Sequence, residues 1–141
     1  MIPVAVDDAI RWLDTGAFLG VAILVFATRP WDARATIGLA MALAGFVLWM
    51  LARSQLGASF SVTAQARKLV THGIYSRVRH PIYWCGEFAY LGLAVAWGHW
   101  VGYLYIVLTC ALQLGRIKKE EAVLESAFGE EYRRYKARTW F

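Results

Sequence analysis

The stretch Ala35–Ala52 reads ATIGLAMALAGFVLWMLA and is followed directly by Arg53. These 18 uncharged residues come close to the roughly 20 apolar residues that a helix needs to cross about 30 Å of hydrocarbon. Gly38, Ala42 and Gly45 recur at the spacing of one helix face, and such small residues allow two membrane helices to approach closely. The stretch therefore predicts a membrane-spanning helix that packs tightly against a neighbour.

A shorter apolar run precedes this stretch. Thr15–Thr28 is uncharged, and it reaches spanning length when the preceding helical turn is added. The tripeptide Arg29-Pro30-Trp31 then ends the run with a basic residue, a helix breaker and an aromatic side chain of the kind found at membrane interfaces. Residues 1–53 are therefore expected to form an N-terminal helical hairpin.

A long apolar run fills much of the second half of the chain. Between residues 81 and 115, only Glu87 and His99 are ionisable. As a single helix this run would measure about 52 Å at 1.5 Å per residue, which is too long for one untilted span. The turn-forming residues around His99 divide the run, so we expect two helices over 81–97 and 101–116.

The remaining two segments differ from these spans. Residues 54–80 mix Ser, Gln, Thr and Gly with an alternation that includes Phe60 and Val62, which predicts an extended loop at the membrane surface. Residues 117–141 are charged, and their apolar side chains recur at helical spacing, with Gly129 as a point where the helix bends or stops. The chain is thus expected to be one all-α integral membrane domain, with about four transmembrane helices and an amphipathic C-terminal helix.

Composition and charge support the membrane assignment. Hydrophobic residues make up 59% of the chain and charged residues 18%, so the chain is more apolar than an average soluble domain. Most of the 15 Lys and Arg residues lie from Arg53 onward, in blocks that flank apolar runs, as expected at the cytosolic face of an inner membrane. Arg29 and Arg34, in the predicted outer loop, count against this orientation. The distribution also argues against nucleic acid as a partner.

Several classes of site receive no support from the sequence. Cys85 and Cys110 are far apart inside apolar runs, so they are expected to be free thiols, and no metal site is expected. Asp7 and Asp8 occupy the place of a basic signal-peptide region, so the first helix is expected to stay in the membrane. No dinucleotide-binding glycine motif, P-loop, nucleophile elbow or zinc-protease motif occurs.

A cluster of polar residues lies at the start of the second pair of predicted helices. The run His72–Gly86 brings Arg79, His80 and the hydroxyl of Tyr83 to the start of an apolar helix. Because polar groups need partners where water is scarce, a purely structural span has little use for them. Pro81 presets the helix start and His80 takes the cap position, which leaves the positive end of the helix available to an anion.

Three carboxylates lie where they need partners. Glu87 is two turns into the apolar helix after His80, and it is expected either to hydrogen-bond a neighbouring helix or to take part in the chemistry. Glu121 falls on the apolar stripe of the C-terminal helix, whereas Glu120 flanks it. A carboxylate in a buried stripe needs a cationic or hydroxyl partner, from a ligand or from Arg79. The cluster and these carboxylates together predict a site for a small charged ligand at the membrane surface.

Two ordered motifs give the chain a family resemblance. The first is Leu69-Val70-Thr71-x-Gly73-x-Tyr75-x-x-x-Arg79-His80-Pro81-x-Tyr83-x-x-Gly86, and the second is Glu120-Glu121-x-x-Leu124-x-x-x-Phe128-Gly129-x-x-Tyr132-x-x-Tyr135. The match covers roughly residues 53–138 and resembles the isoprenylcysteine carboxyl methyltransferase and phospholipid methyltransferase superfamily. The N-terminal hairpin is similar to this superfamily only in being hydrophobic.

The resemblance implies an integral membrane methyltransferase that uses S-adenosylmethionine without a Rossmann domain. It implies a cytosolic cofactor-binding loop over 54–80 and places the cofactor against that loop, the helix start and the paired glutamates. The residues expected to bind the cofactor are Leu69, Val70, His72, Tyr75, His80, Pro81, Tyr83, Glu120 and Glu121. The resemblance also implies Arg116 beside the acceptor carboxylate, and Arg79 and Glu87 are the other expected catalytic residues.

The expected reaction is carboxyl O-methylation of an isoprenylcysteine-like or related lipid that is reached from the bilayer. A carboxylate acceptor needs alignment with the methyl group and no general base. N-methylation of a phospholipid amine would need a base, and Glu87 or His80 would be the candidate.

Two other functions stay open. Some sterol reductases share a related helical membrane fold and bind a nicotinamide cofactor, so an NADPH-dependent reductase is one alternative. A non-catalytic membrane scaffold is the other. Gly16 and Gly20 have the spacing of a helix-dimerisation motif and would permit a homodimer.

Overall fold

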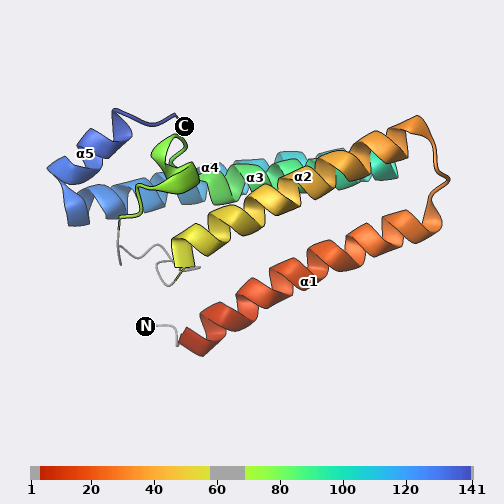
Figure 1. Ribbon diagram of the computed structural model, residues 1–141, viewed down its shortest axis with the longest axis horizontal. Coiled ribbons are helices and arrows are strands. Elements are labelled where there is room, and N and C mark those ends of the chain that lie inside the picture. Colours follow the sequence, from red (N-terminus) through yellow and green to blue (C-terminus); the bar gives the residue numbers. More distant parts are fainter. Residues whose placement is uncertain (1–3, 58–68, 141) are drawn as a thin grey trace.

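The computed structural model describes residues 4–57 and 69–140, with side chains from Leu13 onward. Within these residues the chain is helical, and the long helices run side by side (Figure 1). Their order is α1 (Val4–Thr28), α2 (Ala33–Leu56), the short 3₁₀ helix η2 (Gly73–Ser76), α3 (Pro81–Trp97), α4 (Trp100–Phe128) and α5 (Glu130–Lys136). The expected all-α class is confirmed for the described part of the chain.

Two tight connections join the long helices in pairs. Between α1 and α2, the Asp32 side chain accepts a hydrogen bond at 2.7 Å from the Ala35 amide, which caps the start of α2. Between α3 and α4, Gly98 adopts a left-handed conformation with φ 65° and ends α3. His99 Nδ1 then accepts a hydrogen bond at 3.3 Å from the Val101 amide at the start of α4. The turn expected around His99 is confirmed.

The end of α4 differs from the sequence-based expectation. The helix does not stop near residue 116 but continues to Phe128. The change from apolar to charged residues marks a change of surroundings and not a helix boundary, because Lys, Glu, Ala and Leu are all strong helix formers. The break comes at Gly129, with φ 49°, where the sequence predicts a bend or stop. The amphipathic segment 117–141 is therefore divided between the end of α4 and α5.

The predicted loop over 54–80 also begins later than expected. Helix α2 continues through these first positions to Leu56. The alternating residues Phe60 and Val62 lie outside the described residues. From residue 69 onward, the described chain contains one 3₁₀ turn, η2, before α3 begins.

Helices α2 and α3 pack backbone against backbone. A Cβ atom added to Gly38 would lie 2.3 Å from the Ala96 nitrogen, and one added to Gly92 would lie 2.3 Å from the Ala42 nitrogen. Real Cβ atoms do not approach a backbone this closely, so these positions admit only glycine, and Gly45 is equally confined. The close packing expected from the small residues of α2 is confirmed, and small residues on α3 complete it. We call this contact the α2–α3 seam.

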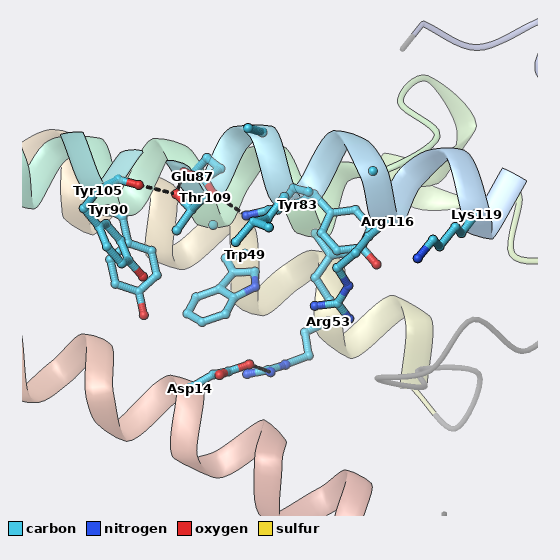
Figure 2. Close-up of a pocket in the computed structure, with 16 residues that line it drawn as sticks. Asp14, Trp49, Arg53, Tyr83, Glu87, Tyr90, Tyr105, Thr109, Arg116 and Lys119 are labelled. Atoms are coloured by element: carbon cyan, nitrogen blue, oxygen red, sulfur yellow. Dashed lines mark hydrogen bonds and ion pairs between the residues drawn. The ribbon is translucent and has the colours of Figure 1, made fainter. Parts of the chain in front are cut away.

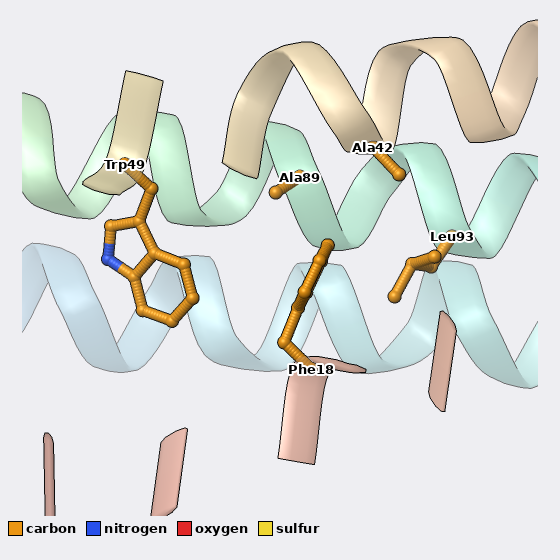
Figure 3. Packing of buried hydrophobic residues seen from close by; sticks show 5 residues of the cluster. All are labelled: Phe18, Ala42, Trp49, Ala89 and Leu93. Atoms are coloured by element: carbon orange, nitrogen blue, oxygen red, sulfur yellow. The ribbon is translucent and has the colours of Figure 1, made fainter. Parts of the chain in front are cut away.

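Helix α1 is attached to this pair through side chains (Figure 3). The Phe18 ring stacks on Phe46 with 4.9 Å between ring centroids, and it meets the Tyr90 ring edge-on at 5.3 Å. A Cβ atom added to Gly16 or Gly20 would meet nothing within 4 Å, so these glycines take no part in packing inside the described chain. The homodimer through Gly16 and Gly20 stays a prediction.

Large apolar side chains cover much of the outer surface. Ile23, Leu43, Val107 and Leu112 are each at least 65% exposed. Helices α2 and α4 are long and apolar enough to cross a membrane, whereas α3 and the apolar part of α1 are shorter. An apolar surface of this extent needs lipid around it, so the chain is a membrane protein. That all four helices span the bilayer stays a prediction.

Candidate functional site

His80 and Pro81 form the start of α3. His80 occupies the N-cap position and Pro81 the first helical position, and both side chains are buried. The fixed φ of proline suits the first turn of a helix, which is why the chain begins α3 here. The imidazole is 4% exposed and lies against Glu120 and Glu121 of α4. The helix start expected from the sequence thus brings His80 to both glutamates.

Glu121 lies at the centre of a charged cluster. Its Oε1 is 3.3 Å from Arg79 Nε and 3.3 Å from His80 Nε2, while its Oε2 accepts a hydrogen bond at 2.8 Å from Lys136 Nζ. Arg79 also donates a hydrogen bond at 3.2 Å to the main-chain carbonyl of Lys136. The structure therefore gives Glu121 the cationic partner that its place on the apolar stripe predicts, and adds Lys136.

Glu120 is contacted differently. The Tyr83 hydroxyl donates a hydrogen bond at 3.0 Å to Glu120 Oε2, and His80 Nδ1 lies 3.8 Å from the same oxygen, beyond hydrogen-bond distance. The guanidinium of Arg116 lies 5.7 Å from the centre of the Tyr83 ring. Glu120 therefore faces Tyr83 and His80. Lys136 and Arg79 instead contact the neighbouring Glu121.

The imidazole of His80 is expected to be neutral. Burial lowers the pKa of His80 below its ordinary value, although the charges of Glu120 and Glu121 act in the opposite direction. A neutral ring has one N–H, and the distances assign it to Nε2, which donates to Glu121. Nδ1 then presents a lone pair to Glu120 Oε2 across 3.8 Å. Two acceptors facing each other in this way are suited to a ligand that donates hydrogen bonds to both.

The segment before Arg79 is held from two sides. The Gln55 side-chain oxygen in α2 accepts a hydrogen bond at 2.8 Å from the Ile74 amide. The Tyr135 hydroxyl in α5 donates at 2.7 Å to the Tyr75 carbonyl. These contacts fix η2 between α2 and α5, and so fix the chain that leads into His80.

Tyr75 contributes a buried hydroxyl. The residue is 4% exposed and packs against Ala52 and Val70. Within the described residues its hydroxyl has no hydrogen-bond partner. Burial, followed by the charge of Glu120, raises the pKa of Tyr75 above its ordinary value, so the hydroxyl keeps its proton. A buried hydroxyl of this kind costs free energy unless something completes it, and a bound ligand would do so.

Two of the residues expected to bind the cofactor lie apart from this cluster. His72 is exposed at the start of η2, and its side chain makes no capping hydrogen bond. Leu69 lines a second cavity of about 390 Å³, which lies between the loop and α5 and includes Tyr135 and Thr139. Of the remaining expected residues, Tyr75, His80, Pro81, Tyr83, Glu120 and Glu121 lie in or against the cluster, while Val70 packs with Tyr75 and Ala52 in the apolar group beside it.

A cavity of about 710 Å³ adjoins the cluster (Figure 2). All four long helices contribute to its wall, and Tyr83 lies on it. Arg53, Arg116 and Lys119 gather toward one end, whereas Tyr90 and Tyr105 lie toward the other (Figure 2). The cavity therefore has a cationic end near Tyr83 and an aromatic end farther along the helices. Its complete lining is Asp14, Trp49, Arg53, Ile82, Tyr83, Gly86, Glu87, Tyr90, Tyr105, Thr109, Ala111, Leu112, Gln113, Gly115, Arg116 and Lys119.

Glu87 lies on the same cavity between the two ends (Figure 2). The Thr109 hydroxyl donates a hydrogen bond to Glu87 at 3.1 Å, and the Gln113 side-chain amide donates another. Both donors belong to α4, so the hydrogen bond to a neighbouring helix that the sequence predicts is present. The expected catalytic role of Glu87 stays a prediction.

Arg53 is a cavity residue that the sequence did not reveal. Its side chain is 7% exposed, donates a hydrogen bond at 2.7 Å to the Thr15 hydroxyl and lies 3.7 Å from Asp14 Oδ2. Its guanidinium also lies 4.9 Å from the centre of the Trp49 ring. These contacts connect α2 to α1. The only signal in the sequence was that Arg53 closes an apolar run, which by itself indicates a membrane boundary.

Two comparisons with known proteins bear on this site. Residues 33–131 match the model of a family described as phospholipid methyltransferase, and this range includes α2, α3, α4 and the charged cluster except for Lys136. The chain is also 40% identical over 89 residues to the protein-S-isoprenylcysteine O-methyltransferase of Schizosaccharomyces pombe. That alignment covers 58% of this chain and 37% of the yeast protein, so this chain corresponds to only part of its relative's length.

Proposed function

We propose that this chain, which belongs to the phospholipid methyltransferase family, is an S-adenosylmethionine-dependent methyltransferase that acts on a lipophilic acceptor. The observation that carries the proposal is the position of Tyr83. Its hydroxyl donates a hydrogen bond to Glu120 in the charged cluster, and the residue also lines the 710 Å³ cavity. One side chain therefore joins a site suited to a small charged cofactor to a cavity suited to a lipid.

The residues of the cluster fit the cofactor. S-adenosylmethionine carries an ammonium group, a carboxylate and hydroxyls beside its sulfonium. The acceptors His80 Nδ1 and Glu120 Oε2 face each other across 3.8 Å, where an ammonium group could donate to both. Tyr75 offers a buried hydroxyl without a partner in the described residues. When bound, the cofactor supplies an electrophilic methyl group.

Between the paired glutamates, the geometry favours Glu120 as the cofactor ligand. Glu121 already meets Arg79, His80 and Lys136 at 3.3 Å or less. Those contacts engage both of its oxygens, so a further ammonium would add a third cation to a carboxylate that already meets two. Glu120 accepts from the neutral Tyr83 hydroxyl and keeps its charge uncompensated by these three groups. In this proposal Glu120 binds the ligand, and Glu121 holds Arg79, His80 and Lys136 in place.

The cavity favours an acceptor with an anionic head. At its cationic end, Arg116 and Lys119 lie on the same wall as Tyr83, whereas Arg53 is already paired with Asp14. A carboxylate held there would face the cluster, while an apolar chain would extend toward Tyr90 and Tyr105. The carboxylate oxygen would take the methyl group as its bond to sulfur breaks. Alignment of these two atoms is the contribution of the protein, and no proton has to be removed.

The proposal also includes the identity of the acceptor and the location of the protein in the membrane. The acceptor is an isoprenylcysteine-like lipid carboxylate, in keeping with the name of the Schizosaccharomyces pombe relative, an isoprenylcysteine O-methyltransferase. It reaches the cavity from the bilayer, and α1, α2, α3 and α4 all cross that bilayer. The charged cluster lies at the cytosolic face of the inner membrane, next to the block of basic residues after α4.

Calorimetric titration of the full chain in detergent tests the cofactor. S-adenosylhomocysteine should bind the wild type, and NADPH should not. Glu120→Gln should weaken binding by about tenfold or more, because a hydrogen bond to a charged group contributes about 1.5–3 kcal/mol. Glu125→Gln, on an exposed turn of the same helix, is the matched control and should bind normally. NADPH binding, or no loss in Glu120→Gln, would contradict the proposal.

Transfer of a labelled methyl group tests the acceptor. An S-farnesylated cysteine should be methylated on its carboxylate in the presence of S-adenosylmethionine, and its carboxamide analogue should not react. Phosphatidylethanolamine serves as the amine acceptor in the same assay. Methylation of phosphatidylethanolamine and not of the carboxylate would assign the chain to N-methylation instead.

A further inference from the structure

We infer that Lys136, in the last turn of α5, is a positioning residue that acts through Glu121 to hold Arg79 and His80 in the geometry needed for cofactor binding. The inference rests on the proposed function and extends it to a helix that does not itself line the large cavity. Lys136 lies seven residues after the break at Gly129, and its ammonium reaches back to Glu121 at 2.8 Å.

The segment that contains Lys136 and Trp140 is hydrogen-bonded to the residues just before α3 at several points. The main-chain amide of Trp140 donates at 2.7 Å to the Arg77 carbonyl, and the Arg79 amide donates at 3.2 Å to the Trp140 carbonyl. These two bonds form a short parallel bridge between Val78 and Trp140. The Thr139 hydroxyl is bonded at 3.0 Å to the carbonyl of Tyr135. The position of Lys136 is therefore fixed relative to Arg79 by the backbone, before any charge is considered.

Charge balance explains what Lys136 adds. Arg79, His80 and Tyr83 face the two glutamates from the start of α3, and Lys136 and the buried Tyr132 face them from α5. With His80 neutral, Arg79 and Lys136 are the two cations in contact with Glu121. Without Lys136, Glu121 would lose one of them, and its half-buried carboxylate would carry less compensated negative charge. The nearest group that could compensate for it by taking up a proton is His80.

Protonation of His80 would change the ligand site itself. The neutral ring presents a lone pair at Nδ1, whereas the charged ring carries an N–H there. That N–H would turn toward Glu120 Oε2, now 3.8 Å away, and would occupy the oxygen assigned to the ammonium of the cofactor. Lys136 thus keeps both acceptors open although it touches neither of them.

Three variants test this role. Lys136→Met removes the charge, Lys136→Arg restores it, and Lys118→Met removes an exposed lysine of α4 that takes no part in the cluster. S-adenosylhomocysteine binding is measured by calorimetry on the full chain in detergent at pH 8 and pH 6. In a background with His72 and His99 replaced by Gln, NMR then follows the titration of the single ring of His80.

Lys136→Met should bind S-adenosylhomocysteine about fivefold more weakly at pH 8, as expected for loss of one partly exposed ion pair, and the deficit should grow at pH 6. Its His80 titration should move to higher pH than in the wild type. Lys136→Arg and Lys118→Met should match the wild type in both measurements. An unchanged His80 titration in Lys136→Met would overturn the inference even if binding falls. If the wild type itself does not bind, the proposed function fails instead.

Discussion

Helix α3 is held in two regions by opposite means. Along most of its length, the α2–α3 seam brings Gly38 and Gly92 into backbone contact without any polar side chain. At its first turn, His80 is held by Glu121, which is in turn held by Arg79 and Lys136. The seam depends on shape, which neither pH nor salt changes, whereas the cluster depends on charge. The first region fixes where α3 lies, and the second is where we propose that a charged ligand binds.

The largest expected effect lies in the seam. Gly38→Leu would place a side chain where a Cβ atom already meets the Ala96 backbone at 2.3 Å. Overpacking that the backbone cannot relieve should cost at least about 3 kcal/mol of the free energy of unfolding, enough to prevent a folded preparation. Gly16→Leu is the matched control, because a Cβ atom at Gly16 meets nothing within 4 Å. Thermal unfolding in detergent, followed by circular dichroism, measures both. Equal stability of the two variants would show that the seam does not fix α3.

A smaller effect is expected in the cluster. Glu121→Gln removes the charge that Arg79 and Lys136 share, and should cost about 2 kcal/mol of stability, as for hydrogen bonds to charged groups. Binding of S-adenosylhomocysteine should fall about tenfold with it, because His80 Nε2 loses its charged acceptor. Calorimetry and thermal unfolding are measured on the same preparation. A loss of stability with unchanged binding would separate Glu121 from the ligand site.

Helix α1 offers a third attachment and a smaller expected effect. Arg53→Met breaks the bond to Thr15 while keeping an apolar side chain beside Trp49. We expect a loss of about 1.5 kcal/mol of stability and a higher KM for the lipid acceptor, because the wall between α1 and α2 loosens. Binding of S-adenosylhomocysteine should stay at the wild-type value. Weaker binding of that ligand would show that α1 reaches the charged cluster, contrary to the contacts described.

The smallest expected effect is a pH dependence of the free energy of unfolding, which the charged cluster should show and the α2–α3 seam should not. Because burial holds the pKa of His80 below its unfolded value of about 6.5, the stability linked to His80 is fully present above pH 6.5. It is lost as the pH falls below 6.5 toward the folded pKa, since the unfolded chain then binds more protons. Unfolding of the wild type measured between pH 8 and pH 5 should show this decline. His80→Gln should have a flatter curve, and an identical slope would contradict the assignment of a neutral ring.

Local patterns predicted the parts of the fold that depend on local causes. The small residues of α2 predicted the seam, the residues around His99 predicted the turn, and Gly129 predicted the end of α4. The end of α4 beyond residue 116 was misjudged because a change of polarity looks like a boundary even where every residue favours a helix. Periodicity reports the surroundings of a helix more directly than its length.

Contacts that depend on tertiary geometry could not be predicted in the same way. Arg79 was foreseen as one possible partner of Glu121, because a carboxylate on an apolar stripe needs a cationic or hydroxyl partner. Lys136 follows the turn at Gly129, and the direction of α5 after that turn is not encoded in any spacing. The bond between Arg53 and Thr15 likewise joins residues 38 positions apart on two helices. Each position looked like an ordinary interfacial residue when taken alone.

In the proposed membrane arrangement, the continuous length of α4 sets the distance between the charged cluster and the far side of the bilayer. At 1.5 Å per residue, the 20 steps from Trp100 to Glu120 cover about 30 Å, which equals the usual hydrocarbon thickness. A thicker bilayer would draw Glu120 and the cationic end of the cavity into the acyl region, and a thinner one would lift them clear of it. Under the proposed function, hydrophobic mismatch therefore becomes a variable of the reaction, and the acyl-chain length of the surrounding lipid should tune how easily the cofactor and a membrane-borne acceptor meet at Tyr83.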